Sequence, residues 1–195
     1  MSCDYVVFDL ETTGLSPRFN EIIQIAGTRL QSGGAGTGEH FATFVRPDVA
    51  IPSFITGLTG ISNGDVAKAP SIGEALASFS DFVGDAVLIA HNGHRFDAKF
   101  LWEACARQRL NMRPVPLIDS IHFSKRLFGT ARGTGHGLDA VLFRLGVNPL
   151  DGRRHDARGD VSRLAQAVEL LWRKLDLDAA CSGIPRTQTM LPQRI

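Results

Sequence analysis

Cysteine is scarce in this chain of 195 residues, and the three that occur, Cys3, Cys105 and Cys181, lie far apart. No two of them form a CxxC pair, so the sequence argues against a structural zinc site and against a framework of disulfides. Widely spaced cysteines of this kind suit a reducing compartment, and we therefore expect a cytoplasmic location.

Long apolar runs are also missing. No stretch approaches the ~20 residues that a membrane-spanning helix needs, and the N-terminus carries no basic segment followed by an apolar one. The sequence therefore predicts neither a membrane span nor a signal peptide. A chain of this length is expected to form one well-packed domain.

A strong net charge is absent as well, since the balance is +1, but the charges are unevenly distributed. Residues 1–106 hold 6 basic and 12 acidic side chains, a net charge of −6, whereas residues 107–195 hold 15 basic and 8 acidic ones, a net charge of +7. An acidic half joined to a basic half suits a metal site beside a surface that contacts phosphate. The alternative is chance variation on a solvated surface.

The hydrophobic pattern predicts an α/β protein. Strands are expected at Tyr5–Leu10, Ile22–Leu30, His40–Val45, Ala86–Ala90 and Leu117–Ile118, and helices at Ser71–Val83, Arg95–Leu110, Ile121–Phe128, Gly137–Leu145 and Ala157–Leu175. Three strands come first and strands then alternate with helices, which indicates a mixed sheet covered by helices. The periodicity stops after residue 175, so we expect a domain over residues 4–175 and a flexible tail over 176–195.

The stretch VVFDLETTGL, Val6 to Leu15, begins as a buried strand and then places Asp9 and Glu11 two residues apart. Side chains at i and i+2 of a strand point to the same face. Two such carboxylates repel each other unless a divalent cation lies between them, and oxygen ligands suit Mg²⁺ or Mn²⁺. The alternative is a strand that ends at Phe8, with Asp9 in a turn and Glu11 in solvent.

A second candidate carboxylate is Asp97, in the first turn of the helix that follows the turn at Asn92-Gly93. It comes after the carboxyl end of a strand, as Asp9 does, and ligands of α/β sheets gather outside such ends. The alternative is that Asp97 only complements the dipole of its helix.

The stretch RRHDARGDV supplies His155 and Asp160 at the start of the last helix. Five positions on a regular helix are ~140° apart, so the two side chains cannot share one helical face. If both serve one site, His155 must lie in the loop that enters the helix, and Gly159 allows this because it weakens the helix there. The alternative is a surface histidine beside a solvated cluster of charges.

Taken in order, these stretches resemble a known family. FDLETTGL, HNGHRFD and HDARGD match the three motifs of the DEDDh (DnaQ-like) 3′–5′ exonucleases, with secondary matches at LTGIS, IDS and GLDAV. The family includes RNase T, oligoribonuclease and the epsilon-type proofreading subunit of bacterial DNA polymerase III, which the chain resembles most. The resemblance covers nearly the whole chain except the tail, and it implies an RNase H-like mixed sheet of five strands in the order 3-2-1-4-5.

The resemblance also implies roles for the candidate residues. Asp9, Glu11, Asp97 and Asp160 would bind two divalent cations, Mg²⁺ or Mn²⁺, and His155 would act as the general base. Phosphodiester hydrolysis needs an activated water and relief of charge on the leaving oxygen, and two metal ions can supply both. An imidazole suits proton transfer at neutral pH.

A pocket for the 3′-terminal nucleotide is expected beside these carboxylates. The candidate substrate-binding residues, taken from the motifs and from the apolar positions near them, are Thr12, Thr13, Gly14, Leu15, Leu58, Asn92 and Phe96. Apolar side chains can stack or wedge terminal bases with little dependence on sequence. Ordinary core packing is the alternative, above all for Phe96.

We therefore expect a metal-dependent 3′–5′ exonuclease of the proofreading type that acts on single-stranded or frayed DNA and releases nucleoside 5′-monophosphates. An RNA-trimming exonuclease of the same fold is the first alternative, and a non-catalytic nucleic-acid-binding or polymerase-binding module is the second. The chain departs from the family pattern at Asp156, where many members have a small residue. It also lacks the methionine of oligoribonuclease at Thr12-Thr13.

Partners other than the nucleic acid are less defined by the sequence. A DNA polymerase subunit, a sliding clamp and a second copy of the chain are all compatible with the resemblance. In the tail, Gln188, Met190 and Leu191 loosely match the short peptide with which proofreading subunits dock on a clamp. A frayed terminus is the alternative.

Overall fold

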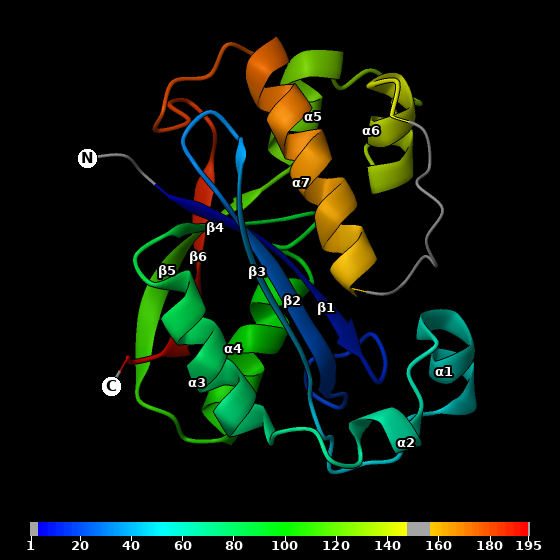
Figure 1. Cartoon of the computed structure of the whole chain (residues 1–195). Coiled ribbons are helices and arrows are strands. Elements are labelled where there is room, and N and C mark those ends of the chain that lie inside the picture. The colour runs from blue at the N-terminus through cyan, green and yellow to red at the C-terminus, as the bar shows by residue number, and fades with distance from the viewer. Residues whose placement is uncertain (1–3, 148–156, 195) are drawn as a thin grey trace.

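The computed structural model describes residues 4–147 and 157–194, which form a mixed sheet with helices on both faces (Figure 1). The strands are β1 (Tyr5–Thr12), β2 (Ile22–Leu30), β3 (Gly36–Phe44), β4 (Val87–Ala90), β5 (Met112–Asp119) and β6 (Arg186–Pro192). The helices are α1 (Ser53–Thr59), α2 (Asn63–Val66), α3 (Ile72–Val83), α4 (Asp97–Arg107), α5 (Ile121–Phe128), α6 (Leu138–Arg144) and α7 (Ala157–Lys174). No helix among these is both long and apolar enough to cross a membrane.

The sheet has the strand order β3-β2-β1-β4-β5-β6. β1 pairs antiparallel with β2 and parallel with β4, and β4 pairs parallel with β5. The expected order 3-2-1-4-5 is therefore confirmed, and β6 is added as a sixth strand at the edge.

Strand β1 lies between two hydrophobic cores because its side chains alternate between the faces of the sheet. Val6 and Phe8 pack in the core that includes residues of α3 and α4, whereas Tyr5 and Val7 pack in the core that includes residues of α5, α6 and α7. This alternation directs the side chain of Asp9, which follows Val7 by two residues, to the face that α7 covers.

The expectation of a flexible tail over residues 176–195 is wrong for its second half. Arg186–Pro192 pairs antiparallel with Met112–Ile118 of β5, and the hydroxyl of Thr189 donates a hydrogen bond to the carbonyl of Ala98 at 2.8 Å. The sequence RTQTMLP hides the strand because Thr187 and Thr189, which are polar, lie on the same face of the strand as the buried Leu191, where apolar residues would be expected. Strand β6 is held by backbone pairing with β5 and by hydrogen bonds from its side chains. Because these contacts do not require alternating apolar residues, the sequence shows no such alternation there.

This strand also changes the interpretation of the clamp-like peptide. Leu191 is fully buried in the core, and its backbone is paired opposite Arg113 of β5. The segment is therefore not a free peptide, and docking on a clamp through Leu191 would require β6 to leave the sheet.

Strand β5 is longer than the two residues expected, since Pro114 and Pro116 in its first half disfavoured a strand. The structure accommodates both prolines because β4 pairs only with Leu117–Asp119. Their half of β5 therefore has a neighbour on one side only, which is β6.

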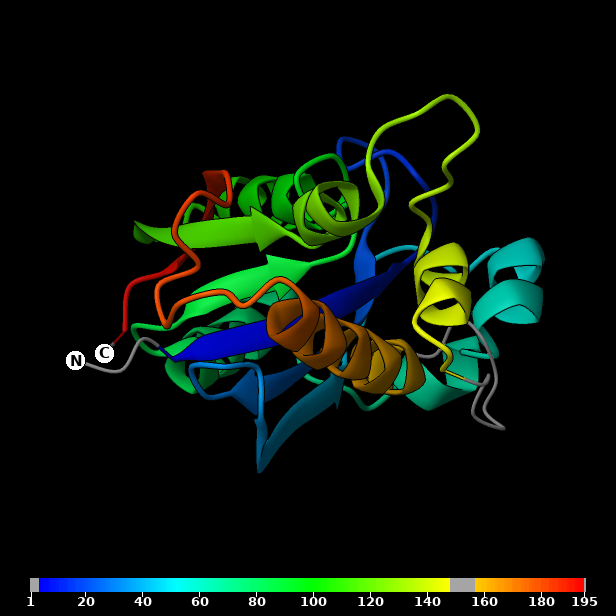
Figure 2. The same ribbon diagram turned by 90° about the horizontal axis from the view of Figure 1, so that it is seen from above.

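Three elements meet at one end of the sheet. β1 ends there, α7 begins there, and α1 lies beyond the end of β1 in both views (Figures 1 and 2). The candidate residues of β1 and α7 are therefore brought to the same end of the molecule.

Candidate active site

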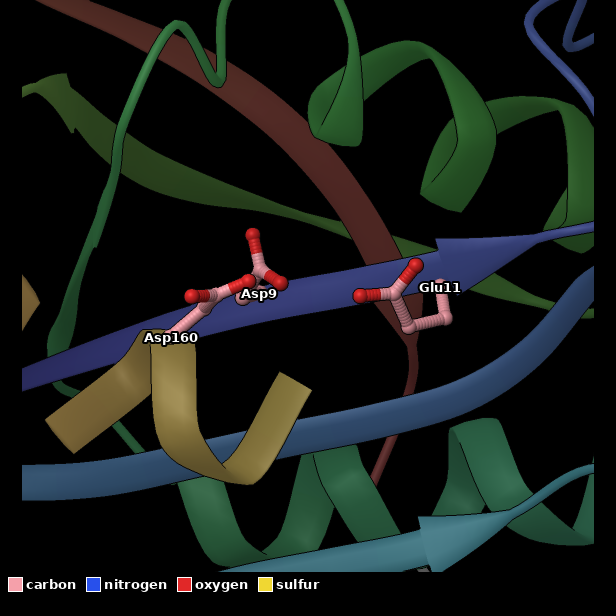
Figure 3. A group of neighbouring side chains, drawn as sticks. All are labelled: Asp9, Glu11 and Asp160. Atoms are coloured by element: carbon pink, nitrogen blue, oxygen red, sulfur yellow. The ribbon is translucent and has the colours of Figure 1, made fainter. Parts of the chain in front are cut away.

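Asp9 and Glu11 lie within β1, in register with Ala26 and Gln24 of β2. The alternative of a strand that ends at Phe8 is therefore wrong. Both carboxylates and that of Asp160 offer oxygen atoms that all lie within 4.8 Å of one another. Figure 3 shows the three side chains converging between β1 and the first turns of α7.

The position of Asp160 depends on how α7 begins. The amide oxygen of Gln24, a buried residue of β2, accepts a hydrogen bond at 3.0 Å from the backbone N–H of Ala157, the first residue of α7. This contact satisfies one of the free N–H groups at the start of the helix. Gln24 lies opposite Glu11 in the sheet. Its hydrogen bond to Ala157 therefore places the start of α7 next to the carboxylates of β1.

A buried arginine accompanies Asp160. The guanidinium Nη1 of Arg163, one turn further along α7, lies 3.6 Å from Oδ1 of Asp160, and only 7% of Arg163 is exposed. The pair restricts where the Asp160 carboxylate can lie, and the positive charge offsets part of the local excess of negative charge.

Asp97 is the first residue of α4 and is almost completely buried, with 2% of its surface exposed. Its Oδ1 has no hydrogen-bond partner among the described residues. A buried carboxylate oxygen without a partner is costly, and it marks a place where a cation or a water would be stabilising. The helix-dipole alternative does not account for this burial.

Burial and neighbouring charges raise the pKa of two of these carboxylates, Asp9 and Asp97. Burial raises the pKa of Asp9 well above its usual value, and the charges of Asp97, Glu11 and Asp160 raise it further. Burial likewise raises the pKa of Asp97 to about 7, with a further contribution from the charge of Asp119. Like charges gathered in a dry place favour protonation, so the cluster needs positive charge in order to stay ionised.

The raised pKa values predict that the metal-free protein becomes less stable as the pH rises. An acid with a higher pKa in the folded state binds more protons folded than unfolded, so the free energy of unfolding falls between the two pKa values. For Asp97 this window runs from 3.8 to about 7. Each pKa unit corresponds to ~1.4 kcal/mol.

Denaturant unfolding of EDTA-treated protein at several pH values across this window measures the effect. Asp97→Asn is expected to flatten the decline because the amide cannot ionise. Asp81→Asn removes an exposed carboxylate of α3 and is expected to keep the decline of the wild type. Equal pH dependence in Asp97→Asn and the wild type would contradict the prediction.

The loop after β1 has a fixed shape. The hydroxyl of Thr12 donates to the carbonyl of Gly14 at 2.6 Å, and the side chain of Asn20 accepts from the N–H of Ser16 at 2.9 Å. A Cβ on Gly14 would lie 2.7 Å from the Asn20 side chain, so any other residue there would push Asn20 away. The hydrogen bond between Asn20 and Ser16, which helps to fix the shape of the loop, therefore requires a glycine at position 14.

A pocket of about 240 Å³ opens beside the carboxylates. It is lined by Asp9, Leu10, Glu11, Thr12, Gly14, Leu15, Ile55, Leu58, Thr59, Phe96 and Asp160. A larger cavity of about 350 Å³, between the start of β2 and the end of α4, contains none of the four carboxylates. The smaller pocket is therefore the one that the site's chemistry can reach.

Two candidate substrate-binding residues do not line this pocket. Thr13 is buried, and its hydroxyl accepts a hydrogen bond from the N–H of Glu21 at 3.0 Å. Asn92 has a positive φ of 60°, and its N–H donates to the carboxylate of Asp119 at 3.0 Å. Both hold the backbone that carries the site, Asn92 in the turn that leads to Asp97.

His155 and its neighbour Asp156 lie outside the described residues. Gln24 and Arg163, which hold the start of α7 and the Asp160 carboxylate, were missed by the sequence analysis. The spacing of Arg163 three residues after Asp160 is a signal that could have been used, because such positions are neighbours on a helix. For Gln24 the sequence carries no comparable signal.

Fold and site together define a class of α/β proteins with an acidic centre at the end of the central strand. A family model described as "Exonuclease" matches residues 6–168. The chain belongs to this exonuclease family, and the resemblance drawn from the three motifs is confirmed.

Related sequences occur in bacterial replication proteins. The chain is 42% identical over 167 residues to a DNA polymerase III subunit epsilon-like protein of Rhodobacter capsulatus, covering 84% of this chain and 23% of that protein. It is 38% identical over 143 residues to a PolC-type DNA polymerase III of Streptococcus thermophilus, covering 73% of this chain and 9% of the relative. The chain thus spans less than a quarter of the length of these relatives.

Solved structures share the fold at low identity. The nuclease domain of 3'hExo, described as a DEDDh family member and bound to rAMP, has a TM-score of 0.74 and 21% identity and covers 98% of this chain and 97% of that one. E. coli Exonuclease I with a dT13 oligonucleotide has a TM-score of 0.73 and 18% identity and covers 89% of this chain and 43% of that one.

Proposed function

We propose that this chain is a metal-dependent 3′–5′ exonuclease of the proofreading type, which removes nucleotides from the 3′ end of single-stranded or frayed DNA. The observation that carries the proposal is the convergence of Asp9, Glu11 and Asp160 within 4.8 Å beside a pocket open to solvent. Membership of the exonuclease family supports the same reaction.

The residues present fit divalent cations. The donors are all carboxylates, which suits Mg²⁺ or Mn²⁺, and the unpaired buried oxygen of Asp97 and the raised pKa of Asp9 both indicate a missing positive charge. We propose that Asp9, Glu11, Asp97 and Asp160 would hold two such ions. When bound, the ions would lower the cost of forming hydroxide and of placing negative charge on the leaving oxygen.

The remaining chemistry belongs to the protein. Hydrolysis adds water to the terminal phosphorus and breaks its bond to the 3′ oxygen, which releases a nucleoside 5′-monophosphate and leaves a 3′ hydroxyl on the shortened strand. We propose that His155 accepts the proton of the attacking water, a role that requires its imidazole to be neutral.

The pocket provides a place for the terminal nucleotide. Leu15, Leu58 and Phe96 offer apolar surface to a base or sugar, and Thr12 and Gly14 bring backbone close to the carboxylates. Leu15 and Leu58 remain 85% and 42% exposed, so their side chains are accessible for contact with a ligand. Apolar contacts of this kind accept any base but require that it be unpaired, which suits a single-stranded or frayed end.

DNA is proposed as the substrate because the relatives of 42% and 38% identity are named as DNA polymerase III proteins. The same names support an association with a replicative polymerase. An RNA-trimming exonuclease is the second candidate, because the structurally similar 3'hExo domain is bound to rAMP.

The two candidates are separated by a direct comparison. DNA and RNA oligonucleotides of one sequence, labelled at the 5′ end, are incubated with the enzyme and Mg²⁺ or Mn²⁺, and the shortened products are resolved with time. We expect stepwise shortening from the 3′ end with faster degradation of DNA. Faster degradation of RNA would replace DNA with RNA as the substrate, and loss of nucleotides from the 5′ end would overturn the proposal.

A further inference from the structure

The short helix α1 presents one flank to the pocket. Its buried residues Ile55 and Thr59 anchor it, Ile55 in an apolar cluster with Ile23 and Ile51. Ile55, Leu58 and Thr59 line the pocket, whereas Thr56 and Gly57 do not. The pocket therefore lies along the flank of α1 that carries these three residues, with Leu58 as its most exposed member.

Phe54 lies at the edge of this flank, next to Leu58 and outside the pocket itself. Residues four apart on a helix are separated by about 40° around the axis and about 6 Å along it, so Phe54 extends the surface of Leu58 by one turn. Phe54 is 76% exposed. No ring–ring or cation–ring contact involving it occurs among the described residues.

An exposed phenylalanine beside a ligand pocket is informative because it continues an apolar surface. Leu15, 85% exposed, lines the same pocket as Leu58, so the apolar surface runs from the pocket mouth along α1 to Phe54. Exposed apolar surface that is continuous with a binding pocket marks an interaction site. The chemistry that fits an open, uncharged ring next to a nucleotide pocket is the face of a second base.

We propose that Phe54, one turn along α1 from Leu58 at the mouth of the terminal-nucleotide pocket, forms a stacking surface for the base of the second nucleotide from the 3′ end. This inference rests on the proposed exonuclease function. The pocket beside the carboxylates takes the terminal nucleotide, and the next base along an unpaired strand falls on the exposed flank of α1. Bases in a strand follow one another at ~3.4 Å in a duplex and further apart when the strand is stretched, which matches a step of one helical turn.

The test compares a substrate that occupies only the terminal nucleotide position with one that also occupies the second position. The p-nitrophenyl ester of thymidine 5′-monophosphate occupies only the terminal position, whereas a short oligo-dT strand also reaches the second. Phe54→Ala is expected to raise the KM for oligo-dT roughly tenfold, the scale of losing one base–aromatic stack, and to leave hydrolysis of the ester unchanged. Phe54→Trp is expected to restore the KM for oligo-dT.

Phe143→Ala is the matched control, because Phe143 is 84% exposed on a different helix, α6. An increase in KM for Phe54→Ala no larger than that for Phe143→Ala, or an equal effect on ester and oligo-dT, overturns the inference while leaving the exonuclease function standing. If the wild type hydrolyses neither substrate, the proposed function fails and the inference fails with it.

Discussion

Asp9→Asn is expected to abolish metal-dependent digestion of a DNA strand. The exchange keeps the shape of the side chain but removes one of the carboxylates that would hold the cations, and Asp9 faces all three of the others. Loss of metal assistance removes several kcal/mol of transition-state stabilisation, a fall in rate of ~10³-fold or more. Glu11→Ala, Asp97→Ala and Asp160→Ala are expected to be inactive for the same reason.

The measurement is the rate of release of mononucleotides from a 3′-labelled strand with Mg²⁺ or Mn²⁺. EDTA is expected to stop the wild type, and Zn²⁺ should not be required. Asp81→Asn, which neutralises an exposed residue of α3, serves as the control and should retain full activity. Turnover near that of the wild type in Asp9→Asn would show that this carboxylate is not a ligand.

A second readout separates lost metal binding from misfolding. Binding of a ligand to the folded state alone raises the melting temperature of a protein. We expect Mn²⁺ to stabilise the wild type and not Asp9→Asn, although the metal-free variant itself should be at least as stable as the wild type. The reason is that the amide removes a charge whose burial raises the pKa of Asp9.

The sequence could predict the carboxylate cluster because alternation along one strand fixes it. Once Val7 faces one core and Phe8 the other, Asp9 and Glu11 must share the face of Val7. The spacing of apolar residues likewise predicted α7. Topology then places the start of that helix at the end of β1, so Asp160 could be expected there.

Other features depend on contacts that leave no local pattern. In the sequence, Gln24 is a single polar residue in an apolar strand. Its role as the acceptor for the N–H of Ala157 becomes evident only when α7 is placed against β2. Strand β6 depends on the backbone of β5, and on Thr189 reaching the carbonyl of Ala98, rather than on apolar alternation. The periodicity of apolar residues indicates only which residues are buried against a core. It therefore cannot predict long-range hydrogen bonds of this kind.

His155→Ala is expected to lower the rate of hydrolysis by ~10²–10⁴-fold, the usual contribution of a general base. The basis is its place in HDARGD, five residues before Asp160, in a family whose reaction needs a proton acceptor. Because a base must be neutral, the rate of the wild type is expected to fall on the acid side of neutrality. Because Asp156 is the next residue in the sequence and is acidic, we expect it to favour the imidazolium, so Asp156→Asn is expected to move this fall to lower pH.

Two measurements distinguish a base from a metal ligand or a structural residue. His155→Ala should still be stabilised by Mn²⁺, because the four carboxylates remain, and its residual activity should lose the fall at acid pH. His122→Ala, which removes a partly exposed histidine of α5, is the control and should keep both the rate and the pH profile of the wild type. An unchanged rate in His155→Ala would exclude it as the base, whereas an unchanged profile in Asp156→Asn would exclude only the coupling between the two side chains.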